Sequence, residues 1–134
     1  MKAILFALLI YAFVGCSNDV EPNVLESDIW NEISNHEWSA SYGFAGEGYY
    51  FYEENGKAMC MFMIYGSGLP IIHESHSEVT IDNEDKIIVN ISIDDSSNQP
   101  LEMKLELKEG KLYQGDKVYE YMFDRDPRSL LLGE

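Results

Sequence analysis

Basic residues are scarce in this chain. Its 134 residues include nine Lys and Arg against 24 Asp and Glu, which gives a net charge of −15 and a pI near 4.4. A protein that grips nucleic-acid phosphates needs a basic stripe to displace their counterions. The charge balance therefore excludes such a backbone binder, and we expect no nucleic-acid partner.

Long apolar runs are also missing. The N-terminal run covers residues 3–14, whereas a membrane-spanning helix needs about 20 apolar residues and the core of a signal peptide about 7–15. This run follows Lys2 and therefore predicts a secretion signal. An ordinary cleavage site requires small residues at positions −1 and −3, and Tyr11 and Phe13 leave no such site before Cys16.

The residues around that cysteine resemble a known processing site. Phe13, Val14, Gly15 and Cys16 resemble the lipobox of bacterial lipoproteins, in which a small residue precedes a cysteine that receives diacylglycerol; leucine is usual where Phe13 stands. The resemblance implies a lipoprotein signal peptide at residues 1–15 and lipidation of Cys16. Two or more acyl chains hold a protein durably, so the lipid bilayer is an expected partner.

The polar stretch after Cys16 resembles the tether of Gram-negative lipoproteins. Ser17 follows the cysteine in place of Asp, which implies the outer membrane rather than retention at the inner membrane. Asp19 and Glu21 resemble the acidic surface-export signals of some of these proteins. We therefore expect a lipidated tether at residues 16–26 and a location in the cell envelope, on the periplasmic or the outer side of the outer membrane.

Cysteine is the other scarce residue, with two in the chain. If Cys16 is acylated, Cys60 has no partner for an intrachain disulfide. Cys60 lies in an apolar stretch without a nearby base, which is typical of a buried small hydrophobe and not of a nucleophile.

The remaining sequence predicts an all-β domain after one short helix. Ser27 and Asp28 offer a helix cap ahead of Ile29, Trp30 and Ile33, whose spacing places three apolar groups on one face. Further on, short stretches rich in Tyr, Phe, Ile, Val and Met alternate with Gly, Asn and Asp turns. We expect strands near residues 37–44, 48–53, 57–65, 69–75, 78–82, 86–94, 100–108 and 112–123, the last with a break around Gly115 and Asp116.

One strand alternates cleanly between apolar and charged residues. Its apolar positions are Leu101, Met103, Leu105 and Leu107, and its charged positions are Glu102, Lys104, Glu106 and Lys108. One wet face and one buried face are typical of an antiparallel sheet. About eight strands with short loops and no helical stripe between them suit a small antiparallel up-and-down barrel or a sandwich, and we expect a monomer.

Several of these features together resemble the lipocalin-like domains of small Gram-negative lipoproteins. They are the short helix, Trp38 at the start of the first strand, and the hairpin residues Asn55 and Gly56. The resemblance implies a lipocalin-like barrel over residues 27–126, followed by a C-terminal tail at residues 127–134.

The same resemblance implies a packing pair that closes the barrel. In lipocalins a Trp on the first strand packs under an Arg beyond the last strand, and these residues are Trp38 and Arg125 here. The chain departs from the Gly-x-Trp pattern of the family, because His36 stands where the Gly is usual.

The predicted hairpin around Asn55 and Gly56 has two apolar faces. A two-residue turn pairs Glu54 with Lys57 and Phe51 with Cys60. One face then carries Tyr50, Tyr52, Met59, Met61 and Met63, and the other carries Tyr49, Phe51, Cys60, Phe62 and Ile64. A barrel wall has only one inside, so two explanations stay open for the Tyr/Met face. The helix or the Leu130, Leu131 and Leu132 tail covers it, or it is a contact surface for a ligand or partner.

Candidates for chemistry are few. His73 and His76 point to opposite faces of a strand, so we expect no metal site there. Asp82, Glu84 and Asp85 lack the spacing of a calcium loop. The sequence has no nucleophile elbow, phosphate loop or zinc-protease motif. We therefore expect no catalytic residue, no metal and no cofactor.

The function classes that remain are a binding module and an inhibitor. The first is a membrane-anchored, non-catalytic barrel that binds a small apolar or saccharide ligand or a partner protein. The second is an inhibitor or immunity-type lipoprotein whose acidic surface blocks a basic toxin or hydrolase; an anchored enzyme ranks third. A barrel cavity above about 300 Å³ favours a small ligand, whereas a filled barrel with an acidic outer patch favours the inhibitor.

Overall fold

The computed structural model describes residues 23–42, 45–67, 70–93, 99–123 and 126–131. Two helical segments come first, the 3₁₀ turn η1 (Val24–Glu26) and the helix α1 (Asp28–Ile33). The strands follow as β1 (Glu37–Tyr42), β2 (Ala45–Glu54), β3 (Lys57–Tyr65), β4 (Ile71–Glu78), β5 (Thr80–Ile81), β6 (Ile87–Ile91), β7 (Leu101–Lys108), β8 (Lys111–Gln114) and β9 (Lys117–Phe123). A second 3₁₀ turn, η2 (Pro127–Leu130), ends the described chain.

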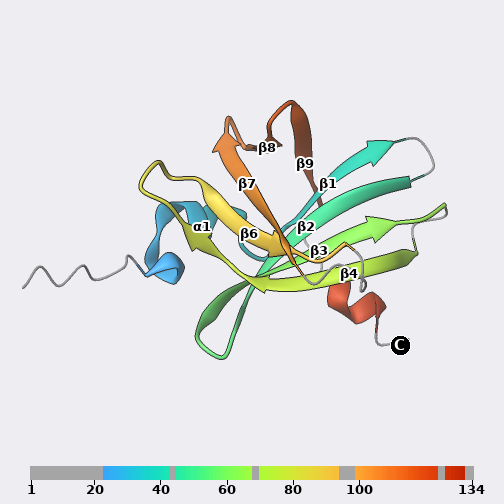
Figure 1. Cartoon of the computed structure of the whole chain (residues 1–134), viewed down its shortest axis with the longest axis horizontal. Coiled ribbons are helices and arrows are strands. Elements are labelled where there is room, and N and C mark those ends of the chain that lie inside the picture. Colours follow the sequence, from blue (N-terminus) through green and yellow to red (C-terminus); the bar gives the residue numbers. More distant parts are fainter. Residues whose placement is uncertain (1–22, 43–44, 68–69, 94–98, 124–125, 132–134) are drawn as a thin grey trace, which may run out of the picture.

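The strands form one antiparallel sheet that curls into a nearly closed barrel (Figure 1). Their order is β4-β3-β2-β1-β9-β8-β7-β6-β5, so neighbours in sequence are mostly neighbours in space. This confirms the predicted all-β, up-and-down architecture with one short helix. The number of strands differs from the prediction. The expected break around Gly115 and Asp116 is a hairpin, in which Gly115 has a φ of 58°. This hairpin divides the last predicted strand into β8 and β9.

Side chains help to close the barrel between β4 and β6. Strand β4 leads through Val79 into β5, and β5 pairs with the start of β6. Beyond that point, the hydroxyl of Ser77 accepts a hydrogen bond from the Asn90 amide at 3.3 Å, and the hydroxyl of Ser75 accepts one from the Ser92 amide at 2.9 Å. Serine side chains therefore join two strands that no longer pair by backbone hydrogen bonds.

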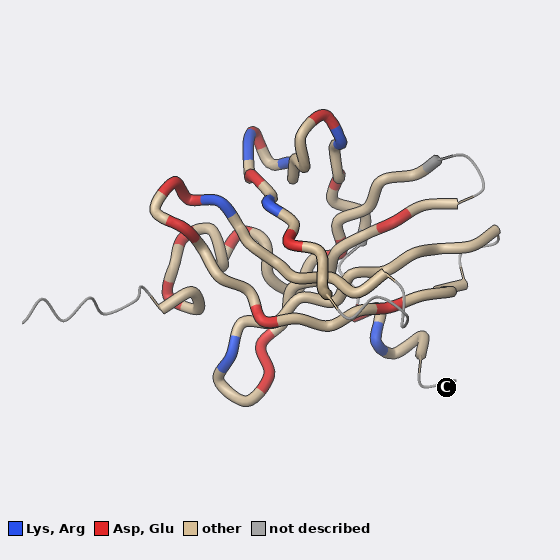
Figure 2. The backbone as a smooth tube through the Cα atoms, in the orientation of Figure 1, with Lys and Arg blue, Asp and Glu red and all other residues tan. Residues whose placement is uncertain are grey.

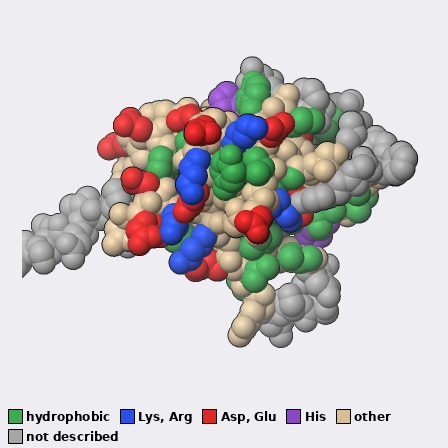
Figure 3. All heavy atoms as spheres, turned by 90° about the horizontal axis from the view of Figure 1, so that it is seen from above, with side chains coloured by type: hydrophobic (Ala, Val, Ile, Leu, Met, Phe, Trp, Pro, Cys, Tyr) green, Lys and Arg blue, Asp and Glu red, His purple; other side chains and the backbone are tan. Residues whose placement is uncertain are grey.

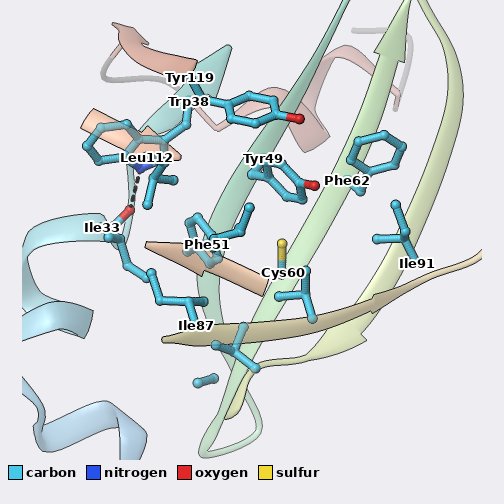
Figure 4. Packing of buried hydrophobic residues seen from close by; sticks show 14 of the residues in the cluster. Ile33, Trp38, Tyr49, Phe51, Cys60, Phe62, Ile87, Ile91, Leu112 and Tyr119 are labelled. Carbon is cyan, nitrogen blue, oxygen red and sulfur yellow. Dashed lines mark hydrogen bonds between the residues drawn. The ribbon is translucent and has the colours of Figure 1, made fainter. Parts of the chain in front are cut away.

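Helix α1 covers one end of the barrel. It begins where predicted, with the hydroxyl of Ser27 accepting a hydrogen bond from the Trp30 amide at 3.1 Å. Trp30 and Ile33 are buried against the strands, and the Ile33 carbonyl accepts a hydrogen bond from the indole of Trp38 (Figure 4). The predicted apolar face of the helix thus becomes part of the core.

Large side chains fill the barrel interior (Figure 4). Tyr49 lies between the rings of Phe62 and Tyr119, with ring centroids 5.2 Å and 4.9 Å away. The other buried members of this core come from nearly every wall of the barrel and include Phe51, Cys60, Ile87, Val89, Ile91, Leu105 and Leu112. The interior is a packed core of the kind seen in small barrels.

The Asn55–Gly56 turn has the predicted two-residue form, and Asn55 and Gly56 both have positive φ angles. Glu54 pairs with Lys57, Phe51 with Cys60, and the register continues along the whole hairpin. The two apolar faces are therefore as predicted, one directed into the barrel and the other away from it.

Candidate functional site

The Tyr/Met face forms a second buried cluster on the outside of the barrel. We call it the outer cluster; its members are Tyr50, Tyr52, Met61, Met63 and Tyr65, with Met59 and Ile71 packed against it. Met61 and Met63 are 0% exposed, and the three tyrosines are also buried. Hydrophobic packing thus holds β2 and β3 from both sides.

The C-terminal turn η2 lies over this cluster; in Figure 1 it is the red coil near the C-terminus, beside β4. Arg128 stacks its guanidinium on the Tyr52 ring at 4.1 Å and also contacts Tyr50 at 5.8 Å. Pro127 is buried, whereas Leu130 is 50% exposed. The tail therefore covers the face, as one of the two sequence interpretations held, and Arg128 is the residue that contacts it. Leu130 and Leu131 are exposed, and Leu132 lies outside the described residues.

A short ion pair fixes the covering arginine. The Asp126 carboxylate accepts hydrogen bonds from Nε of Arg128 at 2.9 Å and from its Nη2 at 2.6 Å. These bonds hold the pKa of Asp126 below its ordinary value. Burial raises the pKa of both Tyr50 and Tyr52, so these rings remain neutral beneath the arginine.

A carboxylate is buried beside the tyrosines. Glu37 is 2% exposed and accepts a hydrogen bond from the hydroxyl of Tyr65, which also contacts the sulfur of Met63 at 3.3 Å. The Tyr65 ring lies over Gly48, where a Cβ atom would be 3.4 Å from its Cε2 atom. Because Gly48 has no side chain, it leaves room for the Tyr65 ring.

His76 lies at the rim of the outer cluster. Its Nδ1 atom is 2.7 Å from the hydroxyl of Tyr52, and its Nε2 atom is 3.7 Å from a carboxylate oxygen of Glu74. His73 points to the other face, as predicted, where its Nε2 is 2.7 Å from the Ser92 carbonyl. Among the described residues, no three His, Cys, Asp or Glu side chains gather in a way that could hold a metal ion.

A separate polar group lies inside the barrel at the end opposite helix α1. The Glu47 carboxylate accepts hydrogen bonds from Lys117 at 2.7 Å and from the hydroxyl of Tyr119, which also lies 2.9 Å from Gln114. Burial and the nearby carboxylate raise the pKa of Tyr119. Nothing in the sequence singled out Glu47, because one carboxylate among 24 acidic residues carries no distinguishing pattern.

An acidic hollow of about 370 Å³ lies at the helix end of the barrel, between η1, α1 and the β5–β6 turn. Its apolar lining comes from Val24, Ile29 and Ile81, and its carboxylates are Asp28, Asp82 and Asp85. Asp82 accepts hydrogen bonds from the amides of Glu84 and Lys86, which lower its pKa and fix the turn.

Few basic side chains offset this acidic end: Lys86 pairs with Glu84 and, with Lys104, helps to lower the pKa of Asp82. Every described Lys and Arg forms an ion pair with a carboxylate, from Lys57 with Glu78 to Arg128 with Asp126. Lysines and carboxylates alternate over the face seen in Figure 3, while Figure 2 shows acidic residues gathered at the β5–β6 turn and along η1 and α1. The negative charge in excess is thus most concentrated near the hollow.

The remaining predicted site residues have structural surroundings or lie outside the described part. Trp38 is buried and packs edge-on against Tyr121, with ring centroids 6.2 Å apart. Its expected partner Arg125 and the lipidation residue Cys16 lie outside the described residues. Cys60 is buried in the inner core, and burial raises its thiol pKa, as expected of an inert cysteine.

Within the described part of the chain, no helix has the length and apolar character needed to cross a bilayer. No family model matches the sequence, and neither a curated protein nor a solved structure matches the chain. The resemblance to lipocalin-like lipoproteins therefore stays an expectation from the sequence.

Proposed function

We propose that this protein is a lipoprotein of the bacterial outer membrane, anchored through acylated Cys16, whose barrel is a non-catalytic binding module for a basic partner protein. The apolar run at residues 3–14, the small residue Gly15 before Cys16 and the polar tether support the anchor. The filled barrel supports a protein partner.

The packed interior of the barrel is the observation that favours a protein partner over a small ligand. Pockets for small ligands enclose about 300–1,000 Å³, but aromatic rings such as Tyr49, Phe62 and Tyr119 occupy the inside of this barrel. A small apolar or saccharide ligand would have to displace that core. We therefore place the partner on the outer surface, where the hollow of about 370 Å³ is open and would take a side chain of a partner protein.

The acidic hollow indicates the chemistry of that partner. A Lys or Arg side chain has an apolar stem and a charged head, and the hollow combines an apolar lining from Val24, Ile29 and Ile81 with the carboxylates of Asp28 and Asp85. An acidic surface also speeds encounter with a basic partner. If the basic partner is a toxin or a hydrolase, the protein acts as an inhibitor or immunity-type lipoprotein.

Affinity capture from native envelopes tests the proposal, with the full-length lipoprotein as bait. We expect a basic protein to be captured at low salt, released by raised salt, and lost with Asp28→Asn/Asp85→Asn. A matched control, Glu109→Gln/Asp116→Asn, removes the same charge at the β7–β8 and β8–β9 turns and should retain the partner. Equal capture by both variants, or a neutral partner insensitive to salt, would contradict the assignment.

A further inference from the structure

Strands β1 and β9 separate at the end of the barrel opposite helix α1. Their ladder ends at the pair of Ser39 with Glu120. Within the described residues, β1 then continues to Tyr42 paired with β2 alone, and the start of β9 is paired with β8 alone. Figure 1 shows the two strands diverging from this point. The barrel wall is therefore open between them, and a groove of about 450 Å³ lies along the opening.

The direction of the β1 backbone along this groove follows from the hairpin turn at residues 55–56. Residues that flank a two-residue loop exchange both backbone hydrogen bonds, and bonded pairs then alternate along the ladder. Counted from that turn, the odd-numbered residues of β2 bond toward β1, in agreement with the 2.8 Å hydrogen bond from the Asn35 amide to the Phe51 carbonyl. Ser41 is opposite Gly46, so its N–H and C=O point away from β2 and into the groove.

The same count applies to β9 on the other side of the groove. Its turn at residues 115–116 is flanked by the pair of Gln114 with Lys117. Val118 follows this pair, so its N–H and C=O point away from β8 and toward β1. Ser41 and Val118 would form the next bonded pair, but the ladder ends before them. Two strand edges thus face the groove with backbone groups that no described strand pairs, which is the template that an added strand requires.

Side chains beneath the groove close it toward the core. Glu47 on β2 reaches across the inner side of β1 to accept hydrogen bonds from Lys117, at 2.7 Å, and from the Tyr119 hydroxyl, both on β9. The residue opposite Glu47 on β1 is Ala40, whose small side chain leaves room for this crossing. An occupant of the groove therefore stays at the surface, where it meets strand backbone and not the hydrophobic core.

The two walls of the groove favour a single extended segment. A second copy of the barrel would bring a whole sheet with any edge strand that it offered to β1, and β9 stands in its way across the groove. An extended segment needs only the room of one strand, about 4.8 Å from its neighbour. The shape therefore indicates a flexible stretch of polypeptide and not the edge of a folded domain.

The charge of the lining indicates which segment this is. The charged residues along the groove are Asp116, Lys117 and Glu120. The ammonium group of Lys117 is held by Glu47 beneath the groove, and Glu120 is bonded to Lys111 on β8. The carboxylate of Asp116 therefore leaves the groove with a net negative charge, which is complementary to Lys or Arg side chains.

We propose that this groove docks an extended basic segment of a protein, which adds to the edge of β1 as a strand. The main chain of the segment bonds the N–H and C=O of Ser41, and its Lys or Arg side chains lie beside Asp116. In strand addition, main-chain hydrogen bonds give affinity and side chains give specificity. The groove and the acidic hollow lie at opposite ends of the barrel, so this site does not depend on the partner proposed for the hollow.

Fluorescence anisotropy with a labelled hexapeptide of alternating lysine and valine tests the docking, with the full-length protein in a non-ionic detergent. We expect saturable binding, and weaker binding of the matching peptide of glutamate and valine. Ser41→Pro removes the N–H that faces the groove and leaves the β1–β2 hydrogen bonds in place. It should weaken binding about tenfold, as expected when a hydrogen-bond donor is lost from an interface.

Two control variants separate the groove from other sites. Ser41→Ala keeps the backbone N–H and should bind the peptide as the parent does, with circular dichroism confirming that it and Ser41→Pro are both folded. Asp28→Asn/Asp85→Asn, in the acidic hollow, should also bind as the parent does. If the peptide is lost with the hollow variant and not with Ser41→Pro, it docks at the hollow and the groove proposal is wrong.

Two further measurements locate the peptide without relying on a variant. Successive amides of a strand face opposite sides, so N-methylation of either the lysine or the valine amides should abolish binding, while N-methylation of the other set should not. Hydrogen exchange followed by NMR should show the Ser41 amide protected only when the peptide is present. A parent protein that does not bind, equal losses with both N-methylated peptides, or a Ser41 amide that stays unprotected would each overturn the proposal.

Discussion

The guanidinium carbon of Arg128 lies over the outer cluster, 4.1 Å from the centroid of the Tyr52 ring. Tyr52 and Tyr50 are themselves stacked, with ring centroids 6.0 Å apart, so one cation covers two aromatic faces. Asp126, two residues earlier, fixes the arginine by paired hydrogen bonds. A short C-terminal turn thereby shields a face of the barrel that would otherwise be open to water.

Removing the arginine should loosen this cover. Cation–π contacts contribute about 0.5–1 kcal/mol when exposed and about 2 when desolvated, and the Arg128 side chain is only partly exposed. We expect Arg128→Ala to lower the free energy of unfolding by about 1 kcal/mol in urea titrations. Arg128→Lys keeps the charge but lacks the planar stacking group. Its free energy of unfolding should therefore lie between those of the parent protein and Arg128→Ala. An unchanged midpoint for Arg128→Ala would show that the stack does not hold the turn.

The Asp126–Arg128 pair should also make stability depend on pH. The arginine depresses the pKa of Asp126 in the folded protein, while the unfolded value is about 3.9. A depressed carboxyl pKa stabilises the folded state above the unfolded pKa, and this contribution is lost as the pH falls through the folded pKa. Between pH 5.5 and 2.5 we expect the parent protein to lose more stability than Asp126→Asn. Asp116→Asn serves as the control, and identical pH profiles for Asp126→Asn and the parent would contradict this account.

Truncating the outer cluster should destabilise the protein strongly. Tyr50 and Met61 are buried, and large-to-small changes at such sites cost about 2–5 kcal/mol each. We expect Tyr50→Ala/Met61→Ala to lose several kcal/mol of unfolding free energy, whereas Ile72→Ala, at a residue that is 66% exposed, should change it little. If the double variant keeps its melting temperature, the Tyr/Met face is instead a contact surface that the turn covers loosely.

Gly48 is required by the backbone of the neighbouring strand. A Cβ atom there would lie 2.7 Å from the Trp38 carbonyl oxygen, and this oxygen cannot move without disturbing the β1–β2 register. Overpacking of this kind costs about 1–3 kcal/mol, which is the loss we expect for Gly48→Ala in urea titrations. A Cβ atom at Gly66 would meet side chains and no backbone, the Cγ2 methyl of the exposed Ile72 at 3.0 Å and the Pro70 ring at 3.7 Å. Gly66→Ala should therefore cost less, and equal losses would argue against the backbone clash.

The local features of the fold could be predicted from the sequence because local chemistry determines them. Asn55 and Gly56 accept positive φ angles, so they specify a two-residue turn and hence which residues share each face of the hairpin. Ser27 specifies the start of helix α1 in the same way. The five residues Tyr50, Tyr52, Met59, Met61 and Met63 were therefore correctly placed on one face.

The cover of that face could not be predicted in the same way. Asp126 before Pro127 is a recognisable start of a helical turn, and Asp126 does accept a hydrogen bond from the Arg128 amide. Nothing local indicates where such a turn packs, because its destination depends on contacts with strands more than seventy residues earlier, at Tyr50 and Tyr52. The contact between His76 and Tyr52 is hidden for the same reason, since it depends on the order of strands in the sheet.

The proposed membrane anchor should depend on a single sulfur atom. If Cys16 carries diacylglycerol and a further acyl chain, each buried CH₂ group contributes about 0.8 kcal/mol of membrane affinity, and the chain stays in the membrane fraction. We expect metabolic labelling with an alkyne fatty acid to mark the parent protein and Cys60→Ser, since Cys60 is buried. Cys16→Ser should lose both the label and the membrane association. A parent protein that is unlabelled and released from membranes would refute the lipoprotein assignment, whatever its barrel binds.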